Sequence, residues 1–185
     1  MANTALLVCD IQTGIIERLK THDTETYLQR VASTIESARE AHLKVIYVRV
    51  AFRPGHPEAA PSDAAKAKGW NTFVEGNPST EIHITIAPKD NDIVVTKRRV
   101  SAFHGTDLDI LLRSLKIETL VICGLSTSGV VMSSVRQGSD MDYKFVVLED
   151  LCLDQDQAMH DACVKVLGKQ AFIVKAADWV AELKK

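Results

Sequence analysis

The segment Glu118-Thr-Leu-Val-Ile-Cys123 runs into Gly124-Leu-Ser-Thr-Ser-Gly129 and then into a helical pattern that carries Val130, Val131, Ser134, Val135 and Gly138. A short, continuously apolar run that leads through a glycine-containing turn into a helix is typical of a buried strand in a parallel sheet. This stretch therefore predicts one strand–turn–helix unit of an α/β domain.

The same unit recurs on both sides of this segment. Five other apolar runs have the pattern of core strands, at residues 5–9, 44–50, 92–96, 144–148 and 171–174. Helical patterns lie at residues 27–38, 106–115, 155–167 and 178–183, and the one at 155–167 carries Ala158, Met159, Ala162 and Val166 on one side. Strands and helices in alternation predict a three-layer α-β-α, Rossmann-like fold with a central six-stranded parallel sheet. No linker is evident, so we expect residues 1–185 to form a single domain.

Residues 53–91 interrupt the alternation. Three prolines and a glycine lie between residues 53 and 61, which stops regular structure there. Trp70 and Phe73 follow, and a short strand could lie at residues 82–86. This stretch is the least regular part of the pattern.

Composition and charge argue against a nucleic-acid-binding protein and against a membrane-spanning one. Apolar residues make up 46% and charged residues 25%, and 24 acidic against 22 basic side chains give a formal charge of −2. There is no basic excess for a nucleic-acid partner, and no apolar run approaches the ~20 residues that a membrane span needs. The four cysteines are scattered without a C-x-x-C pair, and the chain does not begin like a signal peptide. We therefore expect a reduced, cytoplasmic enzyme that acts on a small-molecule substrate.

Polar residues follow three of the predicted strands. The first strand ends in Asp10-Ile-Gln12, the third core strand in Lys97-Arg98-Arg99, and the fourth in the loop at residues 124–129. Ligands of open parallel sheets bind beyond the carboxyl ends of the strands. Each element alone has an ordinary explanation as a cap, a solvated face or a turn. Together they offer a carboxylate, an ammonium group and backbone N–H donors to one crevice.

These residues resemble the isochorismatase-like hydrolases. The resemblance is carried by Asp10-x-Gln12, by Lys97-Arg-Arg-Val-Ser-Ala-Phe103-His-Gly-Thr-Asp-Leu108 and by Thr119-Leu-Val-Ile-Cys-Gly124-Leu-Ser-Thr127, and it continues into Val147-Leu-Glu-Asp150. It implies that Asp10 and Lys97 flank the catalytic position and that the peptide between Leu125 and Ser126 is cis. It also implies a homo-oligomer, a dimer or a larger assembly.

The chain departs from the family pattern at the nucleophile. Most members carry a catalytic cysteine six residues after the glycine that ends the fourth strand, and in this chain that position is Val130, preceded by Gly129. Cys9 and Cys123 lie in predicted buried strands and Cys163 on a helix face, where thiols are inert, and nothing places Cys152 beside Asp10 and Lys97. We therefore expect a member that lacks the nucleophilic cysteine.

Family members without the thiol include the true isochorismatases, which cleave a vinyl ether and release pyruvate. The segment Arg99-Val-Ser-Ala-Phe103 is similar to the stretch after the lysine in those enzymes. The resemblance implies that Asp10 acts as general acid and then as base for water, while Lys97 orients it or holds a substrate carboxylate. An adjacent ammonium group lowers the pKa of Asp10 whereas burial raises it, and the sequence leaves that balance open.

Several further residues are candidates for substrate binding. The complete set is Gln12, Phe52, Trp70, Arg99, Leu125, Ser126, Gly129 and Val130. Gln12 braces the loop or touches substrate, Arg99 is the better anion anchor of the two arginines, and Phe52 and Trp70 could wall or cover the pocket. The loop from Gly124 to Gly129 would supply backbone donors, although its hydroxyl side chains could equally cap the next helix. The paired Asp/His spacing of metal-dependent relatives is absent after the second strand, so we expect no metal and no cofactor.

Three functions remain open from the sequence. The first is hydrolysis of isochorismate or a similar carboxylated enol ether, which the segment at residues 99–103 favours. The second is thiol-independent hydrolysis of an amide, a ureide or another C–N bond, with water activated by Asp10. The third is a non-catalytic role in binding, against which the intact Asp10, Gln12 and Lys97 argue.

Overall fold

The computed structural model describes residues 3–20, 22–58 and 73–185. One six-stranded sheet forms its centre, with the strand order β3-β2-β1-β4-β5-β6. The strands are β1 (Thr4–Cys9), β2 (Lys44–Val50), β3 (Ile93–Lys97), β4 (Thr119–Leu125), β5 (Lys144–Leu153) and β6 (Phe172–Val174). Every neighbouring pair is parallel. The predicted parallel α/β sheet is therefore confirmed.

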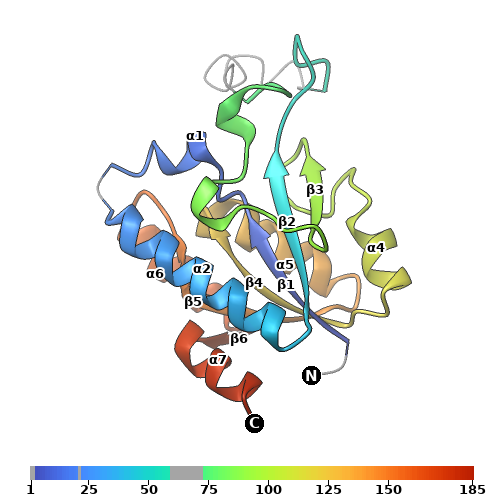
Figure 1. The fold of residues 1–185 in the computed structure, drawn as a ribbon, viewed down its shortest axis with the longest axis vertical. Coiled ribbons are helices and arrows are strands. Elements are labelled where there is room, and N and C mark those ends of the chain that lie inside the picture. The colour runs from blue at the N-terminus through green and yellow to red at the C-terminus, as the bar shows by residue number, and fades with distance from the viewer. Residues whose placement is uncertain (1–2, 21, 59–72) are drawn as a thin grey trace.

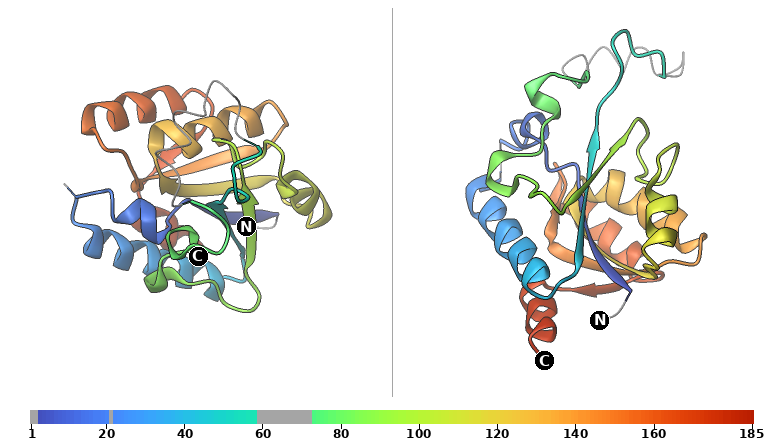
Figure 2. Two further views of the ribbon diagram at one scale, coloured as in Figure 1. Left: turned by 90° about the horizontal axis from the view of Figure 1, so that it is seen from above. Right: turned by 45° about the vertical axis from the view of Figure 1, so that its right-hand side comes forward.

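Helices cover both faces of the sheet (Figures 1 and 2). On one face lie α4 (Leu108–Ser114), α5 (Met132–Ser139) and α6 (Gln157–Leu167), and on the other α2 (Thr24–Glu40) and α7 (Ala176–Leu183). Each layer has its own hydrophobic cluster, because the side chains of each strand point alternately to the two faces. Short segments complete the chain: α1 (Thr13–Ile16), the 3₁₀ turns η2 (Pro78–Thr80) and η3 (Ile84–Ile86), and the π-helical η4 (Thr127–Val131).

The helix predicted at residues 27–38 is present in the structure as part of α2. Its apolar stripe, which includes Tyr27, Val31 and Ile35, is buried against the sheet in α2. The helix begins one turn earlier than the stripe, because the carboxylate of Asp23 accepts a hydrogen bond from the backbone N–H of Thr26 and caps the helix.

Residues 82–86 form no regular strand. Ile82 makes one isolated antiparallel bridge with Gln12, and residues 84–86 form the 3₁₀ turn η3. The ring of His83 accepts a hydrogen bond from the backbone N–H of Thr85, which closes a turn where a strand would need an extended chain.

The direction of the strand connections reverses between β1 and β4. Residues 10–12 leave β1 and residues 124–126 end β4, and the chain connections run in opposite directions from this point of the sheet. In Figure 1 the carboxyl ends of β2 and β3 point upward, toward α1 and the segment at residues 73–86. The three predicted functional strand ends therefore lie at one edge of the sheet. None of the helices in the described ranges is long and apolar enough to cross a bilayer.

Candidate active site

Asp10 and Lys97 form a buried ion pair at the carboxyl edge of the sheet. Asp10 directly follows β1 and Lys97 is the last residue of β3, and β2 lies between these strands. The ammonium Nζ of Lys97 lies 2.9 Å from Oδ2 of Asp10, and the two side chains are only 4% and 7% exposed. The same Nζ donates a 2.9 Å hydrogen bond to the carbonyl oxygen of Arg99. The two residues that the sequence predicts as catalytic are therefore brought together.

Burial has the largest effect on the pKa of Asp10. Burial raises the pKa of this carboxyl, the charge and the hydrogen bond of Lys97 lower it, and the net direction is upward from its ordinary value. The second oxygen, Oδ1, is buried and has no hydrogen-bond partner among the described residues. A buried carboxylate oxygen without a partner is costly unless another group binds there. Asp10 thus offers one oxygen to Lys97 and leaves the other available to a reacting molecule.

Gln12 is a brace of the fold. Its side-chain N–H groups donate to the carbonyl oxygens of Val50 (2.9 Å) and Thr80 (2.7 Å), and its Oε1 accepts from the backbone N–H of Val50 (2.8 Å). The residue is fully buried. These bonds tie the end of β1 to the end of β2 and to η2, two residues from Asp10. Of the two roles expected for Gln12, the geometry favours the brace over contact with substrate.

The segment after β4 bends sharply into η4. The peptide between Leu125 and Ser126 is cis, as the resemblance implies. Oγ of Ser126 accepts a 3.1 Å hydrogen bond from the backbone N–H of Gly129, so this hydroxyl caps the following helix. Gly124 has a φ of 149° and lies so close to β1 that an added Cβ would be 2.2 Å from the carbonyl oxygen of Cys9. The segment therefore packs tightly beside the end of β1.

Two residues that the sequence analysis did not select hold this segment from its far side. The carboxylate of Asp154, 8% exposed, accepts hydrogen bonds from the backbone N–H groups of Ser128 (2.8 Å) and Gln155 (3.0 Å). Nδ1 of His160 lies 2.8 Å from Oγ1 of Thr127, which is fully buried. Asp154 directly follows β5, as Asp10 follows β1, so the search at strand ends could have found it. No sequence signal marked His160, which lies inside α6.

Phe52, the predicted pocket wall, lies on the loop after β2. Arg99, the predicted anion anchor, follows β3 and contacts that loop through Glu58. The exposed guanidinium of Arg99 donates to the carbonyl oxygens of Arg98 and Glu58 (2.7 Å each). Phe52 pairs with Val74 in an isolated bridge, and its ring lies 5.2 Å from that of His56 between centroids. Trp70 lies outside the described residues. In this arrangement the guanidinium of Arg99 is directed to backbone carbonyls.

Glu58 joins this loop to β3. Its carboxylate forms ion pairs with Arg53 and Arg98, and Arg98 also pairs with Glu75. Burial works to raise the pKa of Glu58, but hydrogen bonds and the charges of Arg53 and Arg98 lower it overall. The loop is thereby held beside the strand end that carries Lys97.

All four cysteines are buried and reduced. Burial raises the pKa of Cys9 and Cys123 well above the usual thiol value, that of Cys152 to about 12, and that of Cys163 as well. Val130, the position at which the sequence resemblance would place a nucleophile, is packed in the hydrophobic cluster beneath α4, α5 and α6. A raised thiol pKa opposes formation of the reactive thiolate.

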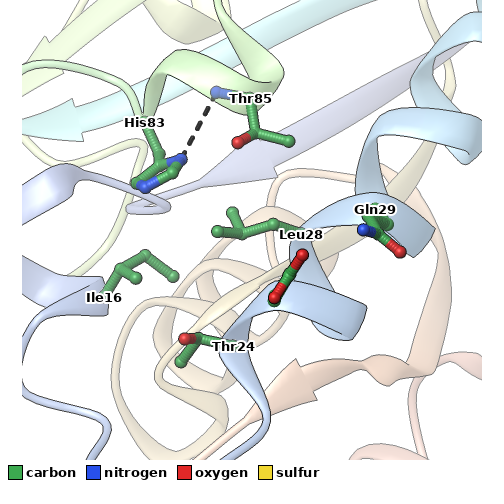
Figure 3. A pocket seen from close by; sticks show the side chains of 7 residues that line it. Ile16, Thr24, Leu28, Gln29, His83 and Thr85 are labelled. Atoms are coloured by element: carbon green, nitrogen blue, oxygen red, sulfur yellow. Dashed lines mark hydrogen bonds between the residues drawn. The ribbon is translucent and has the colours of Figure 1, made fainter.

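The described residues hold no cluster that could bind a metal ion, and one pocket lies apart from the Asp10–Lys97 pair. Within the described ranges, no group of three or more His, Cys, Asp or Glu side chains could hold a metal ion. A pocket of about 330 Å³ lies between α1, the first turns of α2 and residues 83–85 (Figure 3). Its lining is Ile16, Thr24, Glu25, Leu28, Gln29, His83 and Thr85, which includes neither Asp10 nor Lys97.

The chain matches a known protein family over most of its length. The family model described as "Isochorismatase domain" matches residues 4–178. The chain belongs to the isochorismatase family. As an isochorismatase-family hydrolase, it is 32% identical to the isochorismatase family protein YecD of Escherichia coli, over 85% of this chain and 84% of that one.

Two relatives with named activities match over most of the chain. One is the ureidoacrylate amidohydrolase RutB of Azorhizobium caulinodans, 30% identical over 80% of this chain and 74% of its own length. The other is the maleamate amidohydrolase of Pseudomonas putida, 27% identical over 73% of this chain and 63% of its own length. Among solved structures, a cysteine hydrolase from Pseudomonas syringae pv. phaseolicola superposes with a TM-score of 0.91 at 22% identity, covering 98% of this chain and 92% of that one. This last likeness concerns the fold alone.

Proposed function

We propose that this isochorismatase-family hydrolase cleaves the C–N bond of a small carboxylated amide or ureide, with water activated by Asp10 and without a thiol intermediate. The observation that carries the proposal is the pairing of Asp10. Lys97 holds one carboxylate oxygen at 2.9 Å, while the other is buried and free of partners in the described structure. An oriented carboxylate oxygen of this kind can accept a proton from a bound water.

The proposed reaction follows from these groups. Oδ1 of Asp10 accepts a proton as the water oxygen bonds to the substrate carbonyl carbon, and the carbonyl π electrons move to the oxygen. The C–N bond then breaks, the oxygen regains its double bond to carbon, and the leaving nitrogen takes the proton from Asp10. The products are a carboxylic or carbamic acid and ammonia or an amine. Lys97 keeps the carboxylate in place, and its charge favours the anionic form that acts as base.

The relatives with named activities favour this reaction over ether hydrolysis. Those reported above are named as amidohydrolases of maleamate and of ureidoacrylate. The expected cleavage of isochorismate has no such support, so the C–N alternative becomes the proposal. Because both named substrates carry a carboxylate, we include an acidic group in the proposed substrate. Lys97 and Arg98 are already paired with carboxylates, so the exposed guanidinium of Arg99 is the group that we expect to bind it.

The first test is ammonia release from a panel of small carboxylated amides and ureides that includes maleamate and ureidoacrylate. We expect turnover by the wild type and a loss of about 10³-fold in Asp10→Asn, the range for removal of a general base. Asp142→Asn is a matched control, because Asp142 also has a positive φ, 70° against 55° for Asp10, but is exposed in the turn before β5.

A second assay, for pyruvate release from isochorismate, distinguishes C–N hydrolysis from ether cleavage and from a binding role. Pyruvate release from isochorismate with no ammonia from the panel would overturn C–N hydrolysis in favour of ether cleavage. Silence in both arms would leave a binding role. An acyl-enzyme detected by mass spectrometry of the denatured, quenched reaction would overturn the thiol-free route.

A further inference from the structure

Two side chains from the end of β5 and from α6 hold the turn at residues 126–129. The hydroxyl of Thr127 lies 2.8 Å from Nδ1 of His160, and the carboxylate of Asp154 accepts a 2.8 Å hydrogen bond from the backbone N–H of Ser128. Thr127 is fully buried, and a buried hydroxyl needs such a partner. Two consecutive residues of the turn are therefore held by a strand–helix unit that is distant in the sequence.

This turn and the glycine before it lie against the segments that carry the buried ion pair. An added Cβ on Gly124 would lie 2.2 Å from the carbonyl oxygen of Cys9, the residue before Asp10. An added Cβ on Gly129 would lie 3.9 Å from Cγ1 of Val100, three residues after the lysine of the pair. A displacement of the turn would therefore change the space in which a substrate lies beside Asp10.

The hydrogen bonds of the turn fix its shape. The backbone N–H of Ser128 donates to Asp154. The backbone N–H of Gly129 donates to Oγ of Ser126, and a Cβ on Gly129 would lie only 2.7 Å from that oxygen. Both N–H groups are satisfied within the protein, so they act on a reaction by holding the turn in one place and not by binding substrate.

We propose that His160 and Asp154 are positioning residues for the reaction of Asp10, because they hold the turn beside which the substrate must lie. This inference rests on the proposed function. Displacement of reacting groups by about 1 Å can lower a rate by about 100-fold. A looser turn lowers the fraction of bound substrate that is in the reactive geometry, so the loss should fall on kcat and leave KM nearly unchanged.

Two amide replacements of His160 separate positioning from a general structural role. In His160→Asn the amide lies where Nδ1 lies in the imidazole and can still pair with the hydroxyl of Thr127. In His160→Gln the amide lies one bond further along the side chain, away from that position. Glutamine favours helices more than asparagine does, so a purely structural role in α6 predicts that His160→Gln is the milder change.

The rates are compared on the member of the amide and ureide panel that the wild type hydrolyses fastest. We expect kcat of His160→Asn to stay within about threefold of wild type, and that of His160→Gln to fall at least about tenfold with KM within about twofold. Asp154→Asn keeps one acceptor oxygen for two backbone N–H groups and should lower kcat in the same way. Asp161→Asn, at an exposed neighbouring position of α6, is the control and should match the wild type.

Hydrogen–deuterium exchange gives a second readout, which needs no substrate. Exchange of the backbone N–H groups of residues 126–131 should be at least about fivefold faster in His160→Gln than in wild type or His160→Asn, the range for loss of one hydrogen bond. Equal kcat values for His160→Asn and His160→Gln, a loss confined to KM, or unchanged exchange in His160→Gln would each overturn the inference. A wild type that hydrolyses no member of the panel counts against the proposed function alone, and the exchange rates then decide whether His160 holds the turn.

Discussion

The pKa of Asp10 is set by two opposing effects of its surroundings. Its carboxyl group lies in a buried position that favours the neutral acid, and the ammonium group of Lys97 only partly offsets that preference. The residue is therefore poised closer to neutral pH than an exposed aspartate, which is a common property of groups that transfer protons. The raised pKa of Asp10 should be visible in the pH dependence of the reaction.

The first prediction concerns the pH profile. If Asp10 acts as base, kcat/KM falls as pH drops through its raised pKa, so the acid limb should lie above the usual aspartate range. Lys97→Met removes the charge that lowers this pKa and should move the limb to still higher pH. Lys89→Met, which removes an exposed partner of Glu36, is the control and should leave the profile in place. A rate that falls with rising pH would instead indicate that Asp10 acts as an acid.

The second prediction concerns Gln12. Replacing it with leucine would leave the backbone N–H of Val50 and the carbonyl of Thr80 buried without their partner. We expect a loss of about 3 kcal/mol in the free energy of unfolding, measured in urea. Gln170→Leu, at an exposed position, should change it by less than about 0.5 kcal/mol. Equal effects of the two changes would contradict the brace.

At the scale of elements, the sequence predicted what periodicity controls and missed what local hydrogen bonds control. The stripe of α2 and the apolar strands were found because burial dictates their spacing. The turn at residues 84–86 was missed because the imidazole of His83 closes it. The sequence also predicted the apolar side of α6. Spacing alone does not show whether an apolar side packs on the sheet, and in the structure this one faces away from it.

The third prediction concerns the close approach of Gly124 in β4 to Cys9 in the neighbouring strand β1. In Gly124→Ala the new Cβ would meet the carbonyl oxygen of Cys9 at 2.2 Å, at a φ of 149° that side chains rarely adopt. Since neither strand can move without disturbing the sheet, we expect a loss of about 3 kcal/mol or more in unfolding free energy. Gly168→Ala, with φ near −59° and no atom closer than 3.6 Å, should stabilise by about 0.5 kcal/mol. A small effect at Gly124 would show that the strands can separate.

At the scale of the whole molecule, strand order explains why the site was predictable in part. Asp10 and Lys97 each end a strand, and a parallel sheet brings such ends to one edge whatever the details of packing. Asp154 obeys the same rule and could have been found. His160 could not, because it meets Thr127 through the packing of α6, which no strand-end pattern encodes.

The fourth prediction concerns thiol chemistry across the whole chain. Because all four cysteines are buried and their pKa values are raised, the native protein should resist a chromogenic disulfide reagent at neutral pH and keep its activity. After denaturation all four thiols should react. Rapid labelling of one native cysteine together with loss of turnover would identify a nucleophile and contradict the mechanism proposed above.

The backbone conformation of Asp10 determines which substitutions at this codon are compatible with folding. Its φ of 55° lies in the left-handed region, which asparagine, aspartate and glycine enter readily and β-branched residues do not. A single base change in an aspartate codon reaches both asparagine and glycine, but also valine, which fits this conformation worst. Random mutagenesis should therefore yield two classes of inactive gene at this codon. Asn alleles, which keep a polar partner for Lys97, should produce folded but inactive protein. Val alleles, which also leave the buried charge of Lys97 unpaired, should be lost to degradation.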